Sequence, residues 1–213
     1  MENSSFTREQ LLIITDQMKK CLCQIILKNN RGTGFFCEFP VPNKNVNAYA
    51  LITNNHIINE EVLQEGIPIN IGIDNNRENR IISIKNDRKV YTNRETDITI
   101  IEIIEKDGIT NFLKLDENIY NSDILKKSNI YFLYYLGDDN TSRVSFGMLQ
   151  NIEKDIILHN CASGRGSTGG PLLSSKTHKV IGIHKGCLMK PKHINIGSLL
   201  SQALSEFLNN YLK

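Results

Sequence analysis

Three short segments carry side chains that could together attack a carbonyl group. The first contains His56, the second Asp97, and the third Thr168 just before a Gly-Gly-Pro turn. An alcohol is a poor nucleophile at neutral pH, so it must lose its proton to a nearby base as it attacks. Imidazole groups titrate near neutral pH and can take that proton, and a carboxylate can hold the imidazole by its other nitrogen. These residue types predict nucleophilic acyl chemistry.

The order His, Asp, hydroxyl along the chain resembles that of the trypsin-like, chymotrypsin-fold serine proteases. The resemblance runs from Ile26 to Gly197 and includes Gly-Thr-Gly-Phe-Phe at residues 32–36, which is similar to the family's early Gly-x-Gly-Phe strand. It implies a triad in which His56 is the base, Asp97 orients the imidazole and Thr168 attacks. An ordinary glycine-rich hairpin would explain the glycines but not the His and Asp motifs. We therefore expect a trypsin-like endopeptidase, a hydrolase acting on peptide or protein substrates.

The same motif match assigns the oxyanion hole to the backbone N–H groups of Gly166 and Thr168. Two such donors are needed where negative charge develops on the attacked carbonyl. Ser167, one residue earlier, is an alternative nucleophile. Its use would displace the oxyanion donors relative to the attacking hydroxyl, which favours Thr168.

Threonine in the nucleophile position departs from the family, in which this residue is normally serine. The extra methyl group restricts rotation about the Cα–Cβ bond and crowds either the histidine or the substrate carbonyl. Two hypotheses follow from this. One is an active endopeptidase that uses Thr168. The other is a catalytically inactive protease fold, or pseudoprotease, that binds peptides or proteins in the same cleft.

The segment Gly182-Ile183-His184 resembles the pocket strand of bacterial glutamyl endopeptidases and viral chymotrypsin-fold cysteine proteases. In those families the histidine faces the primary specificity pocket. The resemblance implies that His184 donates a hydrogen bond to a carboxylate or carboxamide, so we expect Glu or Gln before the cut bond. Ala162 and Ser163 would complete the pocket wall without adding charge. A histidine packed against a neighbouring strand is the alternative interpretation.

Short strands between two helices are the elements that must position these residues. Apolar residues at helical spacing predict an N-terminal helix over about residues 7–20 and a C-terminal helix over about 198–212. Runs rich in Ile, Val, Phe and Tyr predict strands at 21–27, 33–39, 48–53, 67–73, 80–84, 97–104, 130–136, 143–152, 155–159, 171–173, 179–184 and 193–197. This pattern favours an antiparallel barrel or sandwich. The resemblance implies an all-β double antiparallel barrel, with a first barrel over about 21–110 and a second over about 125–197. We expect residues 1–213 to form one domain.

Composition argues against several other classes of function. The formal net charge is +2, without a basic stripe interleaved with aromatics, so nucleic acid is not an expected partner. The first residues lack the pattern of a secretory signal, and no segment is apolar for long enough to span a bilayer, so we expect a cytoplasmic protein with no membrane partner.

The cysteines and the remaining histidines are expected to be structural. The five cysteines are odd in number and lack paired spacing, which favours reduced thiols: Cys21, Cys23, Cys37, Cys161 and Cys187. Cys161 and Cys187 do not occupy the position before Gly-Gly and are not expected to be nucleophiles. Cys21 and Cys23 would need a second Cys/His pair to form a zinc site, and the sequence offers none. The remaining histidines are expected to be strand-end or loop residues: His159, His178 and His193. We expect no metal and no cofactor.

Activation of the nucleophile loop is left open by the sequence. Secreted trypsin relatives mature by a cleavage that frees an N-terminal amine, and nothing in this chain resembles that cleavage site. The predicted N-terminal helix occupies its place. The loop is therefore expected to be either preformed or switched by a regulatory protein partner.

Overall fold

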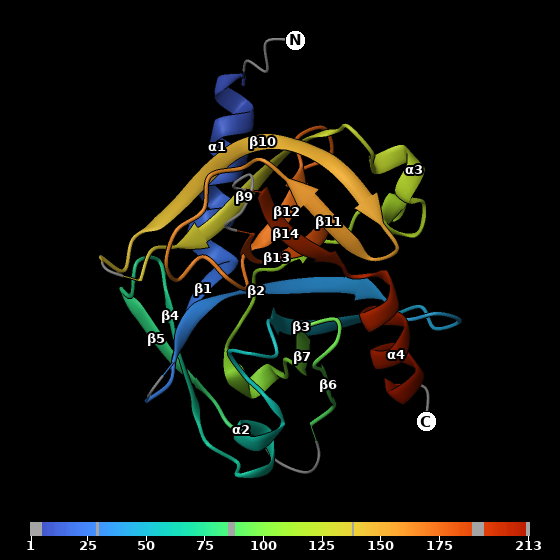
Figure 1. The fold of residues 1–213 in the computed structure, drawn as a ribbon. Coiled ribbons are helices and arrows are strands. Elements are labelled where there is room, and N and C mark those ends of the chain that lie inside the picture. Colours follow the sequence, from blue (N-terminus) through green and yellow to red (C-terminus); the bar gives the residue numbers. More distant parts are fainter. Residues whose placement is uncertain (1–5, 29, 85–87, 138, 189–193, 212–213) are drawn as a thin grey trace.

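The computed structural model shows two bodies built from β-strands (Figure 1). The structure describes residues 6–28, 30–84, 88–137, 139–188 and 194–211. Strands from the first half of the chain form the lower body in Figure 1, and strands from the second half form the upper one. This is the double-barrel arrangement of the chymotrypsin fold.

The first body is an eight-stranded sheet with the order β5-β4-β1-β2-β3-β7-β6, and β8 pairs with β2. Its strands are β1 (Leu22–Ile26), β2 (Arg31–Pro40), β3 (Asn47–Thr53), β4 (Ile69–Ile73), β5 (Glu78–Ile82), β6 (Val90–Asn93), β7 (Ile98–Glu102) and β8 (Leu113–Lys114). Neighbouring strands are antiparallel except β8, which runs parallel to β2. The predicted antiparallel arrangement is confirmed, and this short parallel pairing is an addition to it.

The central strand β2 separates two hydrophobic clusters because its side chains alternate between its two faces. Phe35 and Cys37 belong to the larger cluster, which continues into the second body through residues such as Leu133. Phe36 and Leu51 belong to a smaller cluster confined to the first body. All five of these side chains are buried. β2 is thus packed on both faces, which fixes its position at the seam between the two bodies.

The second body is a closed six-stranded barrel with the order β10-β11-β14-β13-β12-β9. Its strands are β9 (Asn129–Tyr135), β10 (Ser142–Glu153), β11 (Ile156–His159), β12 (Pro171–Ser174), β13 (Val180–Leu188) and β14 (Ile194–Leu199). Closure leaves no unpaired sheet edge in this body, so its end loops are held by strands on all sides.

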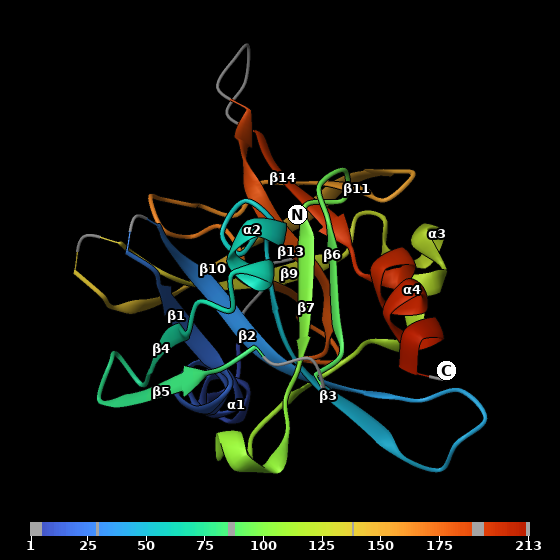
Figure 2. The same ribbon diagram turned by 90° about the horizontal axis from the view of Figure 1, so that it is seen from below.

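Each terminal helix contacts the body built from the opposite end of the chain, and α1 also packs against β1 of its own body (Figures 1 and 2). Helix α1 (Arg8–Lys20) begins with a capping box between Thr7 and Gln10. Its Gln17 donates to the carbonyl of His178 at 2.8 Å and accepts from the Tyr131 hydroxyl at 2.6 Å, so α1 is tied to the second body.

Helix α4 (Ser201–Tyr211) lies beside β6 of the first body in both views. The Phe207 ring on this helix packs edge-on against Phe39 of β2, with ring centroids 6.0 Å apart. Contacts of the two terminal helices therefore help to hold the two bodies together.

The twelve predicted strands and both terminal helices are confirmed. The last helix begins at Ser201 rather than Ser198 because β14 continues through Leu199. Several short elements were not predicted: β6, β8, α2 (Glu60–Gln64), α3 (Ser122–Leu125) and the 3-10 turns at Glu105–Asp107 and Glu117–Tyr120. These elements have two to five residues each, which is too short for a periodic pattern to be visible. His193 and Leu212, at the edges of predicted elements, lie outside the described residues.

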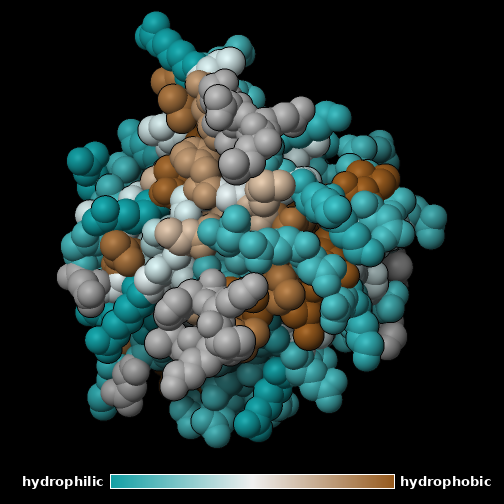
Figure 3. Space-filling model, turned by 45° about the horizontal axis from the view of Figure 1, so that its top comes forward, coloured by the Kyte–Doolittle hydropathy of each residue, from teal (hydrophilic) through white to brown (hydrophobic). Residues whose placement is uncertain are grey.

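The surface shows apolar side chains broken up by hydrophilic ones (Figure 3). The most exposed large apolar residues, such as Leu12, Ile81 and Tyr120, come from distant elements. Such scattered exposure is ordinary for folded proteins. Across the described residues, no helix combines the length and apolar character needed to cross a membrane.

Candidate active site

His56 and Asp97 are brought together by the pairing of β3 with β7. The two strands are antiparallel, and Thr53 at the end of β3 lies opposite Thr99 near the start of β7. The segment that follows β3 therefore meets the segment that precedes β7. In the resulting contact, Nδ1 of His56 lies 2.9 Å from Oδ2 and 3.1 Å from Oδ1 of Asp97. The backbone N–H of His56 also donates to Asp97 Oδ1 at 3.0 Å.

Asp97 is held by its backbone as well as by its side chain. Its φ angle is 56°, in the left-handed region that non-glycine residues seldom adopt. The side-chain amide of Asn54 donates to the Asp97 carbonyl at 2.9 Å, which supports this conformation. The Asp97 side chain is only 14% exposed, whereas the His56 side chain is 46% exposed. Within the described part of the chain, Nε2 of this half-exposed imidazole has no hydrogen-bond partner.

The loop that carries Thr168 turns sharply at two glycines. Gly166 and Gly169 both have φ angles of 89°. A Cβ atom on Gly169 would lie 1.9 Å from the carbonyl oxygen of Thr33, so only glycine fits there. The backbone N–H groups of Gly166 and Thr168 donate to no other group among the described residues. They are therefore free to donate to an incoming oxygen atom.

Thr33 on β2 joins this loop to both bodies. Its backbone N–H donates to the Thr168 carbonyl at 2.8 Å, and its hydroxyl donates to the Gly166 carbonyl at 2.9 Å. The same hydroxyl accepts from the backbone N–H of Tyr135 on β9 at 2.9 Å. Thr33 lies in the predicted strand over residues 33–39, but nothing in the sequence indicated this bridging role.

Replacing Thr33 with valine is expected to loosen the Thr168 loop. The substitution keeps the side-chain shape but leaves the part-buried Gly166 carbonyl and the buried Tyr135 N–H without a partner, and the unpaired N–H alone costs about 1–3 kcal/mol of unfolding free energy. Chemical denaturation measures this loss. The Thr33→Ser variant keeps the hydroxyl and serves as the matched control. Equal stability of the valine and serine variants would contradict the bridging role.

Thr168 and the residues after His56 pack on the same point of β2. A Cβ atom on Gly32 would lie 2.2 Å from Ile57 Cδ1 and 3.3 Å from the Thr168 carbonyl oxygen. The three predicted triad residues thus come from one region at the seam of the two bodies. Among the described residues, however, no hydrogen bond joins the Thr168 hydroxyl to the His56 imidazole.

The alternative nucleophiles are poorly placed. Ser167 is buried, with 1% of its surface exposed, and its Oγ accepts from the N–H of Gly164 at 3.3 Å. Cys161 is buried too, and burial raises the pKa of its thiol to about 12, which disfavours the reactive thiolate. Cys187 is exposed, on the outer part of β13.

His184 forms a buried pair with His159, a residue that the sequence indicated only as a strand end. His184 Nδ1 lies 3.1 Å from His159 Nε2, and both rings contact Phe132. Burial lowers the pKa of His159 to about 4. Burial also lowers the pKa of His184 to about 3, with smaller contributions from His159 and His56. Both imidazoles are therefore neutral at physiological pH.

β13 connects this histidine pair directly to the Thr168 loop. The carbonyl of His184 accepts from the N–H of Gly169 at 3.0 Å, and the N–H of His184 donates to the carbonyl of Gly170 at 2.9 Å. The hydroxyl of Ser163, the second predicted pocket residue, donates to Oδ1 of Asn195 on β14 at 2.6 Å. Ala162, its neighbour, is exposed. His184 is thus fixed to the backbone immediately after the predicted nucleophile.

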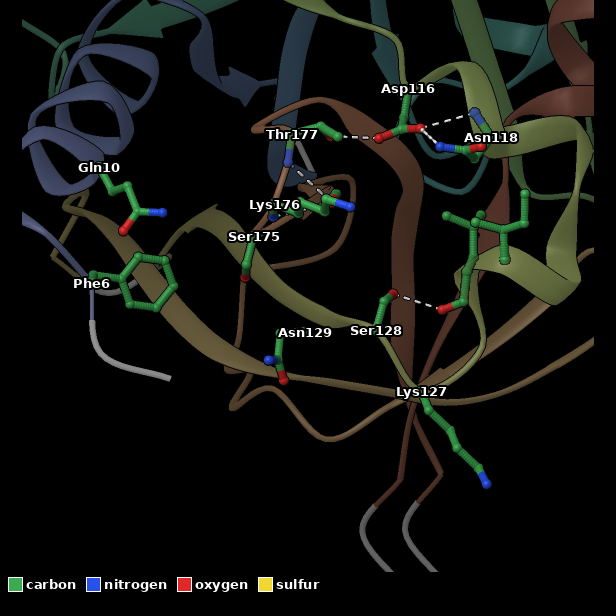
Figure 4. A pocket seen from close by; sticks show the side chains of 13 residues that line it. Phe6, Gln10, Asp116, Asn118, Lys127, Ser128, Asn129, Ser175, Lys176 and Thr177 are labelled. Carbon is green, nitrogen blue, oxygen red and sulfur yellow. Dashed lines mark hydrogen bonds between the residues drawn. The ribbon is translucent and has the colours of Figure 1, made fainter. Parts of the chain in front are cut away.

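A separate cavity of about 520 Å³ lies between the start of α1, the linker before β9 and the turn after β12 (Figure 4). Asp116 is its buried carboxylate. This group accepts from the hydroxyl of Thr177 and from the backbone and side-chain N–H groups of Asn118, both at 2.9 Å. Its acceptor capacity is used within the protein, and neither His56 nor Asp97 lines this cavity.

Comparisons with known proteins agree with this architecture. Structures similar to this one include the protease Rv3671c from M. tuberculosis H37Rv in an inactive form, with a TM-score of 0.65, 13% identity and coverage of 92% of this chain and 91% of that chain. An inactive serine-to-alanine mutant of Rv3671c matches with a TM-score of 0.66, 12% identity and coverage of 92% and 89%. The serine endoprotease from Yersinia pestis matches with a TM-score of 0.64, 13% identity and coverage of 97% and 68%.

At such low identities these structures establish the fold alone. No curated protein is similar enough in sequence to count as a match. The sequence profile of the trypsin-like peptidase domain, by contrast, matches residues 32–183, which is well over half of the chain and includes His56, Asp97 and Thr168. The chain therefore belongs to the trypsin-like peptidase domain family.

Proposed function

We propose that this protein is an endopeptidase in which Thr168, His56 and Asp97 act together on a peptide bond. The observation that carries the proposal is the contact between His56 Nδ1 and the Asp97 carboxylate at 2.9 Å, with Nε2 unbonded among the described residues. A carboxylate in this position fixes the imidazole with its proton on Nδ1 and stabilises the imidazolium that forms during the reaction. Nε2 is then the basic atom.

In the proposed reaction, Nε2 of His56 accepts the proton of the Thr168 hydroxyl as the oxygen attacks the substrate carbonyl. The free N–H groups of Gly166 and Thr168 donate to the carbonyl oxygen as it becomes negatively charged. The imidazolium then gives its proton to the leaving amine, and the C–N bond breaks to leave an ester on Thr168. Water, deprotonated by the same imidazole, hydrolyses this ester and restores the free hydroxyl.

We propose that the preference for Glu or Gln before the cut bond depends on which ring nitrogens of His159 and His184 carry protons. His159 Nδ1 is buried without a partner among the described residues. A bare nitrogen there costs less than an unpaired N–H, so we place the His159 proton on Nε2, from which it donates to His184 Nδ1. The His184 proton is then on Nε2. A neutral donor at this position suits the side-chain oxygen of Gln or Glu.

Peptides that differ only before the cut bond are expected to show Gln or Glu favoured over Arg and Phe by at least about tenfold in kcat/KM, the effect of roughly one well-placed hydrogen bond. The His184→Ala variant is expected to lose this preference. His178→Ala, which changes a histidine on the far side of the second body near α1, is the matched control. A preference for Arg or Phe in the unmodified protein would refute the role of His184.

The ratio of Glu to Gln cleavage is expected to rise as the pH falls from 8 toward 5. The pKa of His184 is low in the free protein, about 3, and a bound carboxylate would raise it, so Glu binding takes up a proton and becomes stronger at lower pH. Gln binding has no such proton uptake. Taking the ratio removes any pH effect on catalysis that the two substrates share.

A pseudoprotease that binds peptides in the same cleft is a second candidate function. Two observations favour it. The methyl group of Thr168 restricts its side chain, and no hydrogen bond joins its hydroxyl to His56 among the described residues. Such a protein would bind peptides through β13 and the oxyanion loop without breaking them.

Incubation of the purified protein with internally quenched peptides tests the choice between these functions. Cleavage by the unmodified protein and none by Thr168→Ala supports the endopeptidase. Binding without cleavage, measured by the fluorescence anisotropy of a labelled peptide, supports the pseudoprotease. Cleavage that survives in Thr168→Ala would contradict the assigned nucleophile.

A further inference from the structure

A second cavity, of about 450 Å³, opens beside the oxyanion loop. Its lining combines the β1–β2 turn with the loop before Thr168: Leu27, Lys28, Asn30, Arg31, Gly137, Arg165 and Gly166. Three of these seven residues carry a positive charge, and none carries a negative one. The cavity therefore concentrates cationic groups next to the glycine that is proposed to hold the oxyanion.

The three cationic side chains are available to a ligand. Lys28, Arg31 and Arg165 are all exposed, and none forms an ion pair within the described residues. The carboxylate of Asp139, on the loop just after Gly137, is already bound by Thr141 and Arg143. A cluster of unpaired cations on a protein of net charge +2 is a local feature rather than a consequence of overall composition.

Hydrogen bonds place this cavity next to both His56 and the oxyanion loop. The side-chain amide of Asn30 donates to the carbonyl of His56 at 2.8 Å. On the other wall, the carbonyl of Arg165 accepts from the N–H of Gly137 at 2.9 Å, and Arg165 directly precedes Gly166. The cavity thus includes the proposed oxyanion donor Gly166 and, through Asn30, lies one residue away from His56.

The side of the cut bond that reaches this cavity follows from the proposed reaction. The residue before the bond extends toward His184, which is fixed to Gly169 and Gly170 at the far end of the Thr168 loop. The leaving amine must face His56, which gives it a proton. The peptide beyond that amine therefore runs away from His184, past Gly166 and along the β1–β2 turn.

We propose that Arg31 and Arg165, supported by Lys28, select substrates with Asp or Glu at the first or second position after the cut bond. This inference rests on the proposed function. Guanidinium groups form paired hydrogen bonds with carboxylates, so they suit these side chains better than lysine alone would. Substrates would then carry acidic or amide side chains on both sides of the cut.

Internally quenched peptides that differ only after the cut bond test this inference. With Gln before the bond, the series carries Glu, Gln, Ala or Lys at the first or second following position. The unmodified protein is expected to cleave the Glu peptides about fivefold faster than the Ala peptides in kcat/KM, which is the upper effect of one exposed charge pair. The preference is expected to shrink at high salt because exposed charges are screened.

The variants Arg31→Gln and Arg165→Gln are expected to lower the Glu-to-Ala ratio toward one. Lys44→Gln is the matched control, because Lys44 is exposed in the hairpin at the opposite end of β2 from Arg31. A ratio near one in the unmodified protein, or a ratio that neither arginine variant changes, would overturn the inference. Absence of cleavage across the whole series, Ala peptides included, would instead reject the proposed function. The preference for Glu over Ala after the bond would then be measured as the ratio of the two peptides' affinities for the Thr168→Ala protein.

Discussion

The Thr168→Ser variant is expected to react with a fluorophosphonate probe about 100-fold faster than the unmodified protein, the cost of a misplacement near 1 Å. Removing the methyl group frees rotation about the Cα–Cβ bond, so the hydroxyl can reach Nε2 of His56, with which it makes no hydrogen bond in the described structure. Labelling followed over time by intact-protein mass spectrometry measures the rate. Thr168→Ala is expected to remain unlabelled.

Ser167→Ala is the control for this comparison, because its hydroxyl is buried and accepts from Gly164. It is expected to change labelling far less than either Thr168 variant. Strong labelling of the serine variant alone would identify an inactive scaffold that retains a competent base and oxyanion hole. Equal rates for the serine and unmodified proteins would show that the methyl group does not obstruct attack. Labelling that persists in Thr168→Ala but not in Ser167→Ala would reassign the nucleophile.

Loss of either member of the His56–Asp97 pair is expected to lower kcat by roughly three to four orders of magnitude, as in other triads of this geometry. Asp97→Asn is the more informative change. The carboxylate accepts from both the ring Nδ1 and the backbone N–H of His56, whereas an amide has a single acceptor oxygen. The amide N–H₂ would favour the wrong tautomer, with the proton on Nε2.

The measurement is kcat for one quenched peptide across unmodified protein, His56→Ala and Asp97→Asn. Asp123→Asn is a matched control, because Asp123 is an exposed carboxylate in the α3 region that pairs with Lys126 and with no other described residue. Circular dichroism confirms that each variant is folded. Activity within tenfold of the unmodified protein for Asp97→Asn would show that the carboxylate does not orient the base.

Much of the fold follows from local patterns in the sequence. The strands of the second body, such as β9 (Asn129–Tyr135), are apolar runs bounded by turn residues, and this local pattern predicts them. The terminal helices show apolar residues at helical spacing. By contrast, β8 owes its existence to pairing with the distant β2, so its two residues carry no signal of their own.

The residues of the candidate active site also divide into those that local sequence predicts and those that depend on distant partners. His56 and Asp97 could be named because each lies next to an apolar strand in a familiar motif. The roles of Thr33 and His159 could not be predicted, since they depend on partners far away in the chain. Thr33 meets Gly166 across 133 residues, and His159 meets His184 across 25. The cations of the second cavity likewise gather only when the turn near Arg31 meets the loop at Arg165.

The exchange of terminal helices between the two bodies also governs when this protein can start to work during its synthesis. Helix α1 is translated before its partners Tyr131 and His178, which lie 114 and 161 residues beyond Gln17. Helix α4, which packs on Phe39, is translated after every described strand of both bodies. A nascent chain therefore cannot complete the contacts of both helices until α4 has emerged, although its first body can begin to fold earlier. Chains that lack α4 would leave the Phe39 face of β2 without its partner Phe207.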